Sequence, residues 1–163
     1  MDSYSCCFSG HRNIPEELQA ELQMRVKNGI DYLYARGVKT FYAGGALGFD
    51  SLAAETVISR RSELGDIRLI IVIPCRNQTA KWSDADKMRY ERINRKADEI
   101  ICLSEHYFQG CMHQRNRYMV DHSQMCICYL REQTGGTAYT VRYAQERGLQ
   151  IYNLAKPRGG GTN

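Results

Sequence analysis

The stretch Arg68-Leu69-Ile70-Ile71-Val72-Ile73 decides the fold. Its last five residues are all apolar, so both faces of a strand formed here would be apolar. Such strands occur in parallel sheets, where helices cover both faces and shield the apolar side chains from water. The stretch therefore predicts a buried interior strand of an α/β protein.

Short apolar or aromatic runs on either side of this stretch alternate with segments of helical period. The other expected strands are Tyr4–Phe8, Lys39–Tyr42, Glu99–Leu103, Met125–Leu130 and Gln150–Leu154. The expected helices are Pro15–Arg36, Phe49–Glu63, Asp84–Ala97, His113–His122 and Thr137–Arg147. This alternation predicts right-handed crossovers between parallel strands, and hence a doubly wound, mainly parallel sheet in a three-layer α/β/α arrangement.

The length and composition indicate one globular domain. The chain has 163 residues, of which 43% are hydrophobic and 25% charged, and these proportions exclude disordered and collagen-like chains. We expect a single domain over residues 1–156. A flexible tail is expected over 157–163, where three glycines follow one another.

The same composition bears on location and partners. No apolar run approaches the roughly 20 residues that cross a bilayer, and the first residues lack the basic and apolar segments of an export signal. Seven cysteines, an odd number without a C-x-x-C pair, favour a reducing compartment, so a cytoplasmic protein is expected. The net charge of +4 suits a phosphate-bearing ligand, but the absence of a basic run argues against nucleic acid as the partner.

Ligands of open parallel sheets bind outside the carboxyl ends of the strands, so the loops that leave the expected strands are the expected place for a site. Most of the glycines, arginines and polar residues outside the expected helices lie in these loops. The loops contain Ser9-Gly10-His11-Arg12, Gly44-Gly45-Ala46-Leu47-Gly48-Phe49-Asp50, Pro74-Cys75-Arg76, the segment Ser104–Arg117, and Gly135-Gly136-Thr137. The concentration of these residues at one edge of the sheet predicts a binding site at the carboxyl edge.

Two glycine-rich loops are candidates to hold a phosphate. In one, Gly44, Gly45 and Gly48 precede a helix, and in the other Gly135 and Gly136 precede a helix with Thr137 as a hydroxyl donor. Glycines let backbone N–H groups approach an anion at a helix N-terminus. The alternative is that each pair is only a tight turn. Neither spacing fits the dinucleotide fingerprint or the P-loop.

Several side chains at this edge are candidates for ligand contacts. Arg115 and Arg117 are candidates to bind a phosphate, with Asp121 orienting Arg117, although Arg117 and Asp121 also have the i, i+4 spacing of a surface ion pair. Asp50 either accepts from a ribose hydroxyl or caps a helix. His11, beside Arg12, either donates to phosphate, acts as a general acid–base or is structural.

Three further groups of side chains lie in or beside these loops. His106, Cys111 and His113 do not have a usual zinc-ligand spacing, so neither a metal nor a cofactor is expected. Cys126 and Cys128 alternate along an expected strand and are interpreted as core residues. Tyr107 and Phe108 either line a base pocket or bury under their loop.

The four segments Phe8-Ser9-Gly10-His11-Arg12, Gly44–Asp50, Arg115–Asp121 and Gly135-Gly136-Thr137 together resemble the YpsA family of the SLOG superfamily, over roughly Phe8 to Leu154. That superfamily includes the LOG cytokinin-activating enzymes and the Smf/DprA DNA-processing proteins. The resemblance implies a Rossmann-like fold and a nucleotide or nucleotide-derived ligand, with a role as a sensor or regulatory protein. Because the superfamily often self-associates, both a monomer and a homodimer stay open.

The resemblance to LOG enzymes leaves hydrolysis as an alternative. Those nucleoside 5′-monophosphate phosphoribohydrolases carry the pattern P-G-G-x-G-T-x-x-E, whose glutamate is implicated in cleaving the bond between base and ribose. If Gly136-Thr137 matches the G-T step, Thr140 occupies the glutamate position, and a threonine cannot replace a carboxylate. An enzyme would then need Asp50, Asp121 or Glu105 instead. A DNA-binding protein resembling Smf/DprA is a third hypothesis.

Overall fold

The structure, a computed structural model, describes residues 4–156, and its six strands form one parallel sheet. Their order is β4-β3-β2-β1-β5-β6, and every neighbouring pair is parallel. The strands are β1 (Tyr4–Gly10), β2 (Val38–Ala43), β3 (Arg68–Ile73), β4 (Glu99–Cys102), β5 (Met125–Tyr129) and β6 (Gln150–Asn153). The expected Rossmann-like α/β fold is confirmed, with β3 paired on both sides. The tail expected over 157–163 lies outside the described residues.

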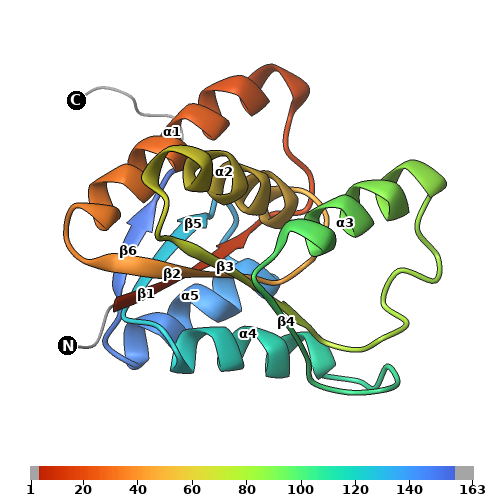
Figure 1. Cartoon of the computed structure of the whole chain (residues 1–163). Coiled ribbons are helices and arrows are strands. Elements are labelled where there is room, and N and C mark those ends of the chain that lie inside the picture. The colour runs from red at the N-terminus through yellow and green to blue at the C-terminus, as the bar shows by residue number, and fades with distance from the viewer. Residues whose placement is uncertain (1–3, 157–163) are drawn as a thin grey trace.

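The helices cover both faces of the sheet. They are α1 (Gln19–Tyr34), α2 (Phe49–Leu64), α3 (Asp84–Lys96), α4 (Cys111–Asp121) and α5 (Gly136–Glu146), and a short 3-10 turn (Glu16–Leu18) precedes α1. In Figure 1, α1, α2 and α3 lie above the sheet, and α4 and α5 lie below it. The strands β2, β3 and β4 follow one another outward on one side of β1, and β5 and β6 lie on its other side. The direction of strand addition therefore reverses at β1, in the centre of the sheet, and the connecting helices pass from one face of the sheet to the other (Figure 1).

The apolar side chains of the strands fill two cores, one on each face of the sheet. Toward α1 and α2, Phe8, Phe41 and Ile71 are fully buried. Toward α4 and α5, Cys126 and Cys128 are fully buried, which confirms their interpretation as core residues. No helix in residues 4–156 is long and apolar enough to cross a membrane.

Most element boundaries agree with the sequence expectation to within one residue, and three of the larger differences have a clear physical reason. The strand β1 continues to Gly10, because Ser9 and Gly10 pair with β5. The helix α1 starts at Gln19, since the Leu18 N–H closes a turn on the Pro15 carbonyl. The helix α4 starts at Cys111, two residues early, because Gly110 precedes it in a left-handed conformation with φ +92°.

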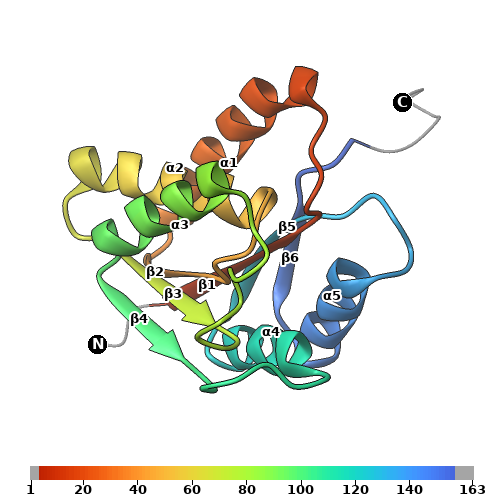
Figure 2. The same cartoon turned by 90° about the vertical axis from the view of Figure 1, so that its right-hand side faces the viewer.

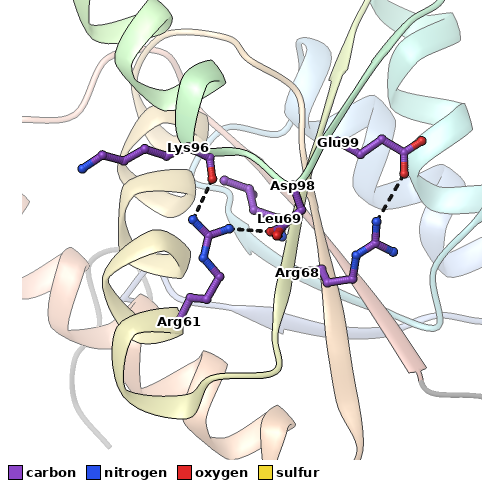
Figure 3. A network of polar contacts seen from close by, with 6 residues as sticks. All are labelled: Arg61, Arg68, Leu69, Lys96, Asp98 and Glu99. Atoms are coloured by element: carbon purple, nitrogen blue, oxygen red, sulfur yellow. Dashed lines mark hydrogen bonds and ion pairs between the residues drawn. The ribbon is translucent and has the colours of Figure 1, made fainter.

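The amino edge of β3 and β4 is held by a polar network (Figure 3). The Asp98 carboxylate accepts from Arg61 at 2.5 Å and from the Leu69 N–H at 2.8 Å, and Arg61 also donates to the Lys96 carbonyl. These contacts join α2, β3 and the segment between α3 and β4. Side chains at this edge therefore hold elements together, and the opposite edge carries the cavity described next.

Candidate ligand-binding site

A cavity of about 830 Å³ opens at the carboxyl edge of the sheet, beside the point where the chain changes faces. Figure 2 shows the reason: the loops after β1 (red) and β5 (light blue) start side by side and diverge to opposite faces of the sheet. A crevice forms at such a switch point in open parallel sheets. Its lining comes from the end of β1, the five loops that follow β1 to β5, and the helices α2, α4 and α5: Phe8, Ser9, Gly10, His11, Arg12, Ala46, Leu47, Asp50, Asn77, Gln78, Ala80, Lys81, Trp82, Tyr107, Met112, Arg115, Asn116, Thr134, Gly135, Gly136 and Thr137.

The glycines of the first two loops make room for protein rather than for the cavity. A Cβ on Gly10 would lie 2.4 Å from the Phe49 ring, and a Cβ on Gly48 would lie 2.0 Å from the Arg12 carbonyl oxygen. The Phe49 N–H donates to the His11 carbonyl at 3.2 Å, which joins the two loops. Gly10 and Gly48 therefore permit these loops to cross in contact.

Gly44 lets two charged side chains, Asp50 and Arg115, lie close to the backbone of its loop. A Cβ there would lie 2.7 Å from an Asp50 carboxylate oxygen and 2.8 Å from the Arg115 guanidinium. Arg115 donates to the Gly44 carbonyl, and its Nε donates to the Asn116 side-chain oxygen at 2.7 Å. Gly45, with φ +71°, lies against Gln78, Ile71 and Tyr90 instead of lining the cavity.

Asp50 and Arg115 are both buried, with 7% and 5% of their surface exposed, and both line the cavity. Burial raises the pKa of Asp50 to about 6, against the opposing effect of Arg115 and of the N–H groups of Ala46 and Gly44. Burial likewise lowers the pKa of Arg115, while Asp50 opposes that shift. The cavity thus contains a carboxylate that takes up a proton near neutral pH.

The raised pKa of Asp50 predicts how stability changes with pH. Since the folded state binds this proton more tightly than the unfolded chain, the stabilisation is complete below about pH 4 and is lost as pH rises through 6. We expect the unfolding free energy of the wild type, relative to Asp50→Asn, to fall by about 2.5 kcal/mol between pH 4 and pH 8. Denaturant unfolding of both proteins at several pH values measures this difference, and a constant difference would contradict the assignment.

His11 joins two loops of the cavity. Its Nε2 accepts from the Arg131 N–H at 2.7 Å and the Glu132 N–H at 3.3 Å, which assigns the ring proton to Nδ1. Burial lowers the pKa of His11, and the ring packs edge-on against Tyr129. The Nε2 is therefore occupied by the backbone after β5, so His11 positions that loop relative to β1.

The N-terminus of α5 is open toward the cavity. Gly135, with φ +99°, precedes the helix, and Gly136 and Thr137 begin it. No atom of the described structure outside the adjoining residues and helix backbone lies within 4 Å of a Cβ built on Gly135 or Gly136. Unlike the glycines at 10, 44 and 48, these two glycines leave space for a ligand beside backbone N–H groups.

Thr140, at the position of the LOG glutamate, forms a hydrogen bond within α5. Thr140 is 1% exposed, and its hydroxyl donates to the Gly136 carbonyl at 2.9 Å. Its side chain thus bonds to its own helix and does not line the cavity.

Arg117 and Asp121 face α5 instead of the cavity. Arg117 donates to the Tyr139 hydroxyl at 2.9 Å, whereas Asp121 accepts from the Tyr143 hydroxyl at 2.7 Å and pairs with Arg147 at 3.4 Å. Asp121 ends α4, about 9 Å further along the helix axis than Arg115. The structure does not bring these two residues together with the cavity residues.

One wall of the cavity was not predicted from the sequence. The loop between β3 and α3 contributes Asn77, Gln78, Ala80, Lys81 and Trp82, of which none was a candidate. The available signal was the chain's single tryptophan within a polar loop. Tyr107 lines the cavity and is 61% exposed.

Two further groups considered from the sequence were His106, Cys111 and His113 as possible metal ligands and Glu105 as a substitute carboxylate. Within residues 4–156, no three His, Cys, Asp or Glu side chains come together in a way that could hold a metal ion. Glu105 pairs with Arg76 at 2.8 Å, and this contact lowers the pKa of Glu105.

A parallel sheet with a polar cavity at its switch point defines a Rossmann-like α/β fold with a candidate ligand site. The YpsA family model (YspA SLOG family) matches residues 11–154, so the chain belongs to the YpsA family of SLOG proteins. It is also similar to the SPbeta prophage-derived protein YoqJ of Bacillus subtilis, with 32% identity over 128 residues that cover 70% of this chain and 75% of YoqJ.

Solved structures show the same fold at low identity. DNA processing protein A from Helicobacter pylori is 20% identical with a TM-score of 0.68, and the match covers 96% of this chain and 67% of that one. DNA processing protein A from Streptococcus pneumoniae is 17% identical with a TM-score of 0.69, and the match covers 99% of this chain and 52% of that one. This chain thus spans about half of the pneumococcal protein.

Proposed function

We propose that this protein binds a nucleotide or a nucleotide-derived ligand in the switch-point cavity and acts as a sensor or regulatory protein. The observation that carries the proposal is the open N-terminus of α5 at Gly135 and Gly136, beside a cavity of about 830 Å³. Backbone N–H groups and the helix dipole favour an anion there. A phosphate group is an anion that can occupy the open space at Gly135 and Gly136 and accept hydrogen bonds from these N–H groups.

The charges of the lining support an anionic ligand. Arg12 and Lys81 are exposed cations of the lining, and Arg115 is a buried cation of the same lining. Asp50 is a buried carboxylate of the cavity lining and is a candidate to accept a hydrogen bond from a ribose hydroxyl. Its bonds from the Gly44 and Ala46 N–H groups hold it in place. The site therefore offers groups for both a phosphate and a sugar.

Binding without turnover is favoured over hydrolysis by the placement of the side chains. At the position of the LOG glutamate, Thr140 is buried and bonds to its own helix, and Asp121 lies outside the cavity lining. A phosphoribohydrolase would have to use Asp50. Release of free base from a ribonucleoside 5′-monophosphate, lost in Asp50→Asn, would establish that alternative.

DNA binding is the second alternative. DNA processing protein A from Helicobacter pylori binds single-stranded DNA, and this chain shares its fold. The net charge of +4 offers few phosphate contacts, so any affinity should be modest and strongly salt-dependent. A gel-shift titration at low salt without a shifted band would remove this alternative.

We further place the protein in the cytoplasm. All seven cysteines are free thiols, which accords with a reducing compartment.

Gly136→Glu is expected to abolish nucleotide binding and leave the fold intact. The added carboxylate occupies the open space at the start of α5 and repels a phosphate, while a negative charge there stabilises the helix by about 0.5 kcal/mol. Calorimetric titration with the four ribonucleoside 5′-monophosphates measures binding, and thermal unfolding measures stability.

The control for charge is Gly136→Gln, which has the same size without the charge. We expect Gly136→Gln to weaken binding less than Gly136→Glu. Unchanged affinity in Gly136→Glu would contradict the assignment of the phosphate to α5.

A further inference from the structure

We propose that the wall formed by the β3–α3 loop is a subsite for a nucleobase, which stacks on the indole of Trp82. This inference rests on the proposed function and adds where in the cavity the base of the nucleotide binds. It assigns a role to a loop whose residues the sequence did not predict to be part of the site.

Trp82 is held in a fixed position at the edge of the cavity. It is half-buried, and its ring packs edge-on against Tyr90 of α3, with ring centroids 5.4 Å apart. Its backbone N–H donates to the Thr79 carbonyl at 3.0 Å within a hydrogen-bonded turn. An indole that is already ordered provides a π-face for a base at little entropic cost.

The adjoining helix end does not favour a phosphate at this wall. The Ser83 hydroxyl caps α3 by accepting from the Asp86 N–H at 3.1 Å, and Asp84 and Asp86 add negative charge to the first turn. The start of α5 differs, because Gly135 has no side chain to cap the helix and Gly136 leaves open space. Lys81 adds one exposed cation to the wall of Trp82, but the two helix ends favour the phosphate at α5 and the uncharged base at this wall.

A second aromatic side chain enters the cavity from the next strand. Tyr107 lies in the loop after β4, and β4 is the neighbour of β3. The two loops are joined by the Arg76–Glu105 ion pair at 2.8 Å and by the Arg76 N–H on the Ser104 carbonyl at 3.2 Å. Both loops lie to the right of the sheet in Figure 1. An aromatic ring that is 61% exposed beside a cavity suits contact with a flat ligand.

The strand order separates this aromatic wall from the anion end. From β3 to β1 there are two strand intervals and from β3 to β5 three, which correspond to about 10 and 14 Å. The loop after β5 carries Gly135 and Gly136, and the loop after β3 carries Trp82. A ligand that reaches both ends needs a spacer between its base and its phosphate, and a ribose is such a spacer.

Fluorescence provides the test, because Trp82 is the chain's only tryptophan and its emission reports this wall alone. Adenosine 5′-monophosphate and the other three ribonucleoside 5′-monophosphates are titrated against ribose 5-phosphate. At least one nucleotide should change the emission of the wild type, and ribose 5-phosphate should not. Trp82→Ala should weaken binding of that nucleotide by roughly 5- to 150-fold and leave ribose 5-phosphate binding unchanged.

Trp82→Phe, which keeps an aromatic face, is the matched variant and should retain most of the affinity. Calorimetric binding of a nucleotide without any change in emission would overturn the base subsite and leave the proposed function standing. An equal loss of nucleotide and ribose 5-phosphate affinity in a folded Trp82→Ala would also overturn it. Absence of binding of all these compounds to the wild type would overturn the proposed function itself, and the subsite with it.

Discussion

Gly48→Ala is expected to lower the free energy of unfolding by about 4 kcal/mol. Two costs add at this position. The φ angle of Gly48 is +79°, which L-residues rarely adopt, and the new Cβ would lie 2.0 Å from the Arg12 carbonyl oxygen. Because this neighbour is backbone and the Phe49 N–H holds the same loop, the collision cannot be relieved by a rotamer change.

Gly65→Ala is the matched control for this variant. Gly65 has φ +86°, and in the described structure no atom beyond its chain neighbours lies within 4 Å of a built Cβ. It therefore carries the backbone strain without the collision and should lose about 2 kcal/mol. Chemical denaturation of both variants gives the comparison. Equal losses of unfolding free energy would show that the contact between the loops after β1 and β2 is not the reason for a glycine at position 48.

Arg115→Met is expected to lower the free energy of unfolding by about 4 kcal/mol at pH 8. The substitution keeps much of the buried volume but leaves the Gly44 carbonyl without its donor and the Asp50 carboxylate without its nearby cation. At pH 4, where Asp50 is protonated, the loss should be smaller. Denaturant unfolding at the two pH values measures the difference.

Two further variants separate the charge effect from packing. Arg117→Met removes an arginine of the same helix whose partner is the neutral Tyr139 hydroxyl, and its cost should be about 1 kcal/mol. Adding Asp50→Asn to Arg115→Met should recover about 2 kcal/mol at pH 8, because it removes the unpaired charge. A double variant as unstable as Arg115→Met alone would contradict the coupling of the two residues.

The fold was predictable because its signals are local. An apolar run such as Leu69–Ile73 specifies a strand covered on both faces, and the three- or four-residue period of Leu22, Val26 and Ile30 specifies a helix face that the structure buries. The carboxyl edge was predictable for the same reason, since parallel strands must all end there.

The roles of the individual residues depend on packing between distant segments, which the sequence does not show. Gly48 and Gly136 look alike in the chain, yet one lies against the Arg12 backbone and the other borders open space. The i, i+4 spacing of Arg117 and Asp121 predicted a pair, but both found partners on α5. Trp82 faces the cavity only because its loop folds back against α3.

The central claim, that the switch-point cavity binds a nucleotide without cleaving it, is tested most directly by one-dimensional proton NMR. The four ribonucleoside 5′-monophosphates are mixed and recorded over hours with the wild type or with Gly136→Glu. We predict selective broadening of at least one nucleotide with the wild type, none with Gly136→Glu, and no signals of free base. Broadening of equal size with both proteins, or no broadening with either, would contradict nucleotide binding at this site, and free base appearing with the wild type would contradict binding without turnover.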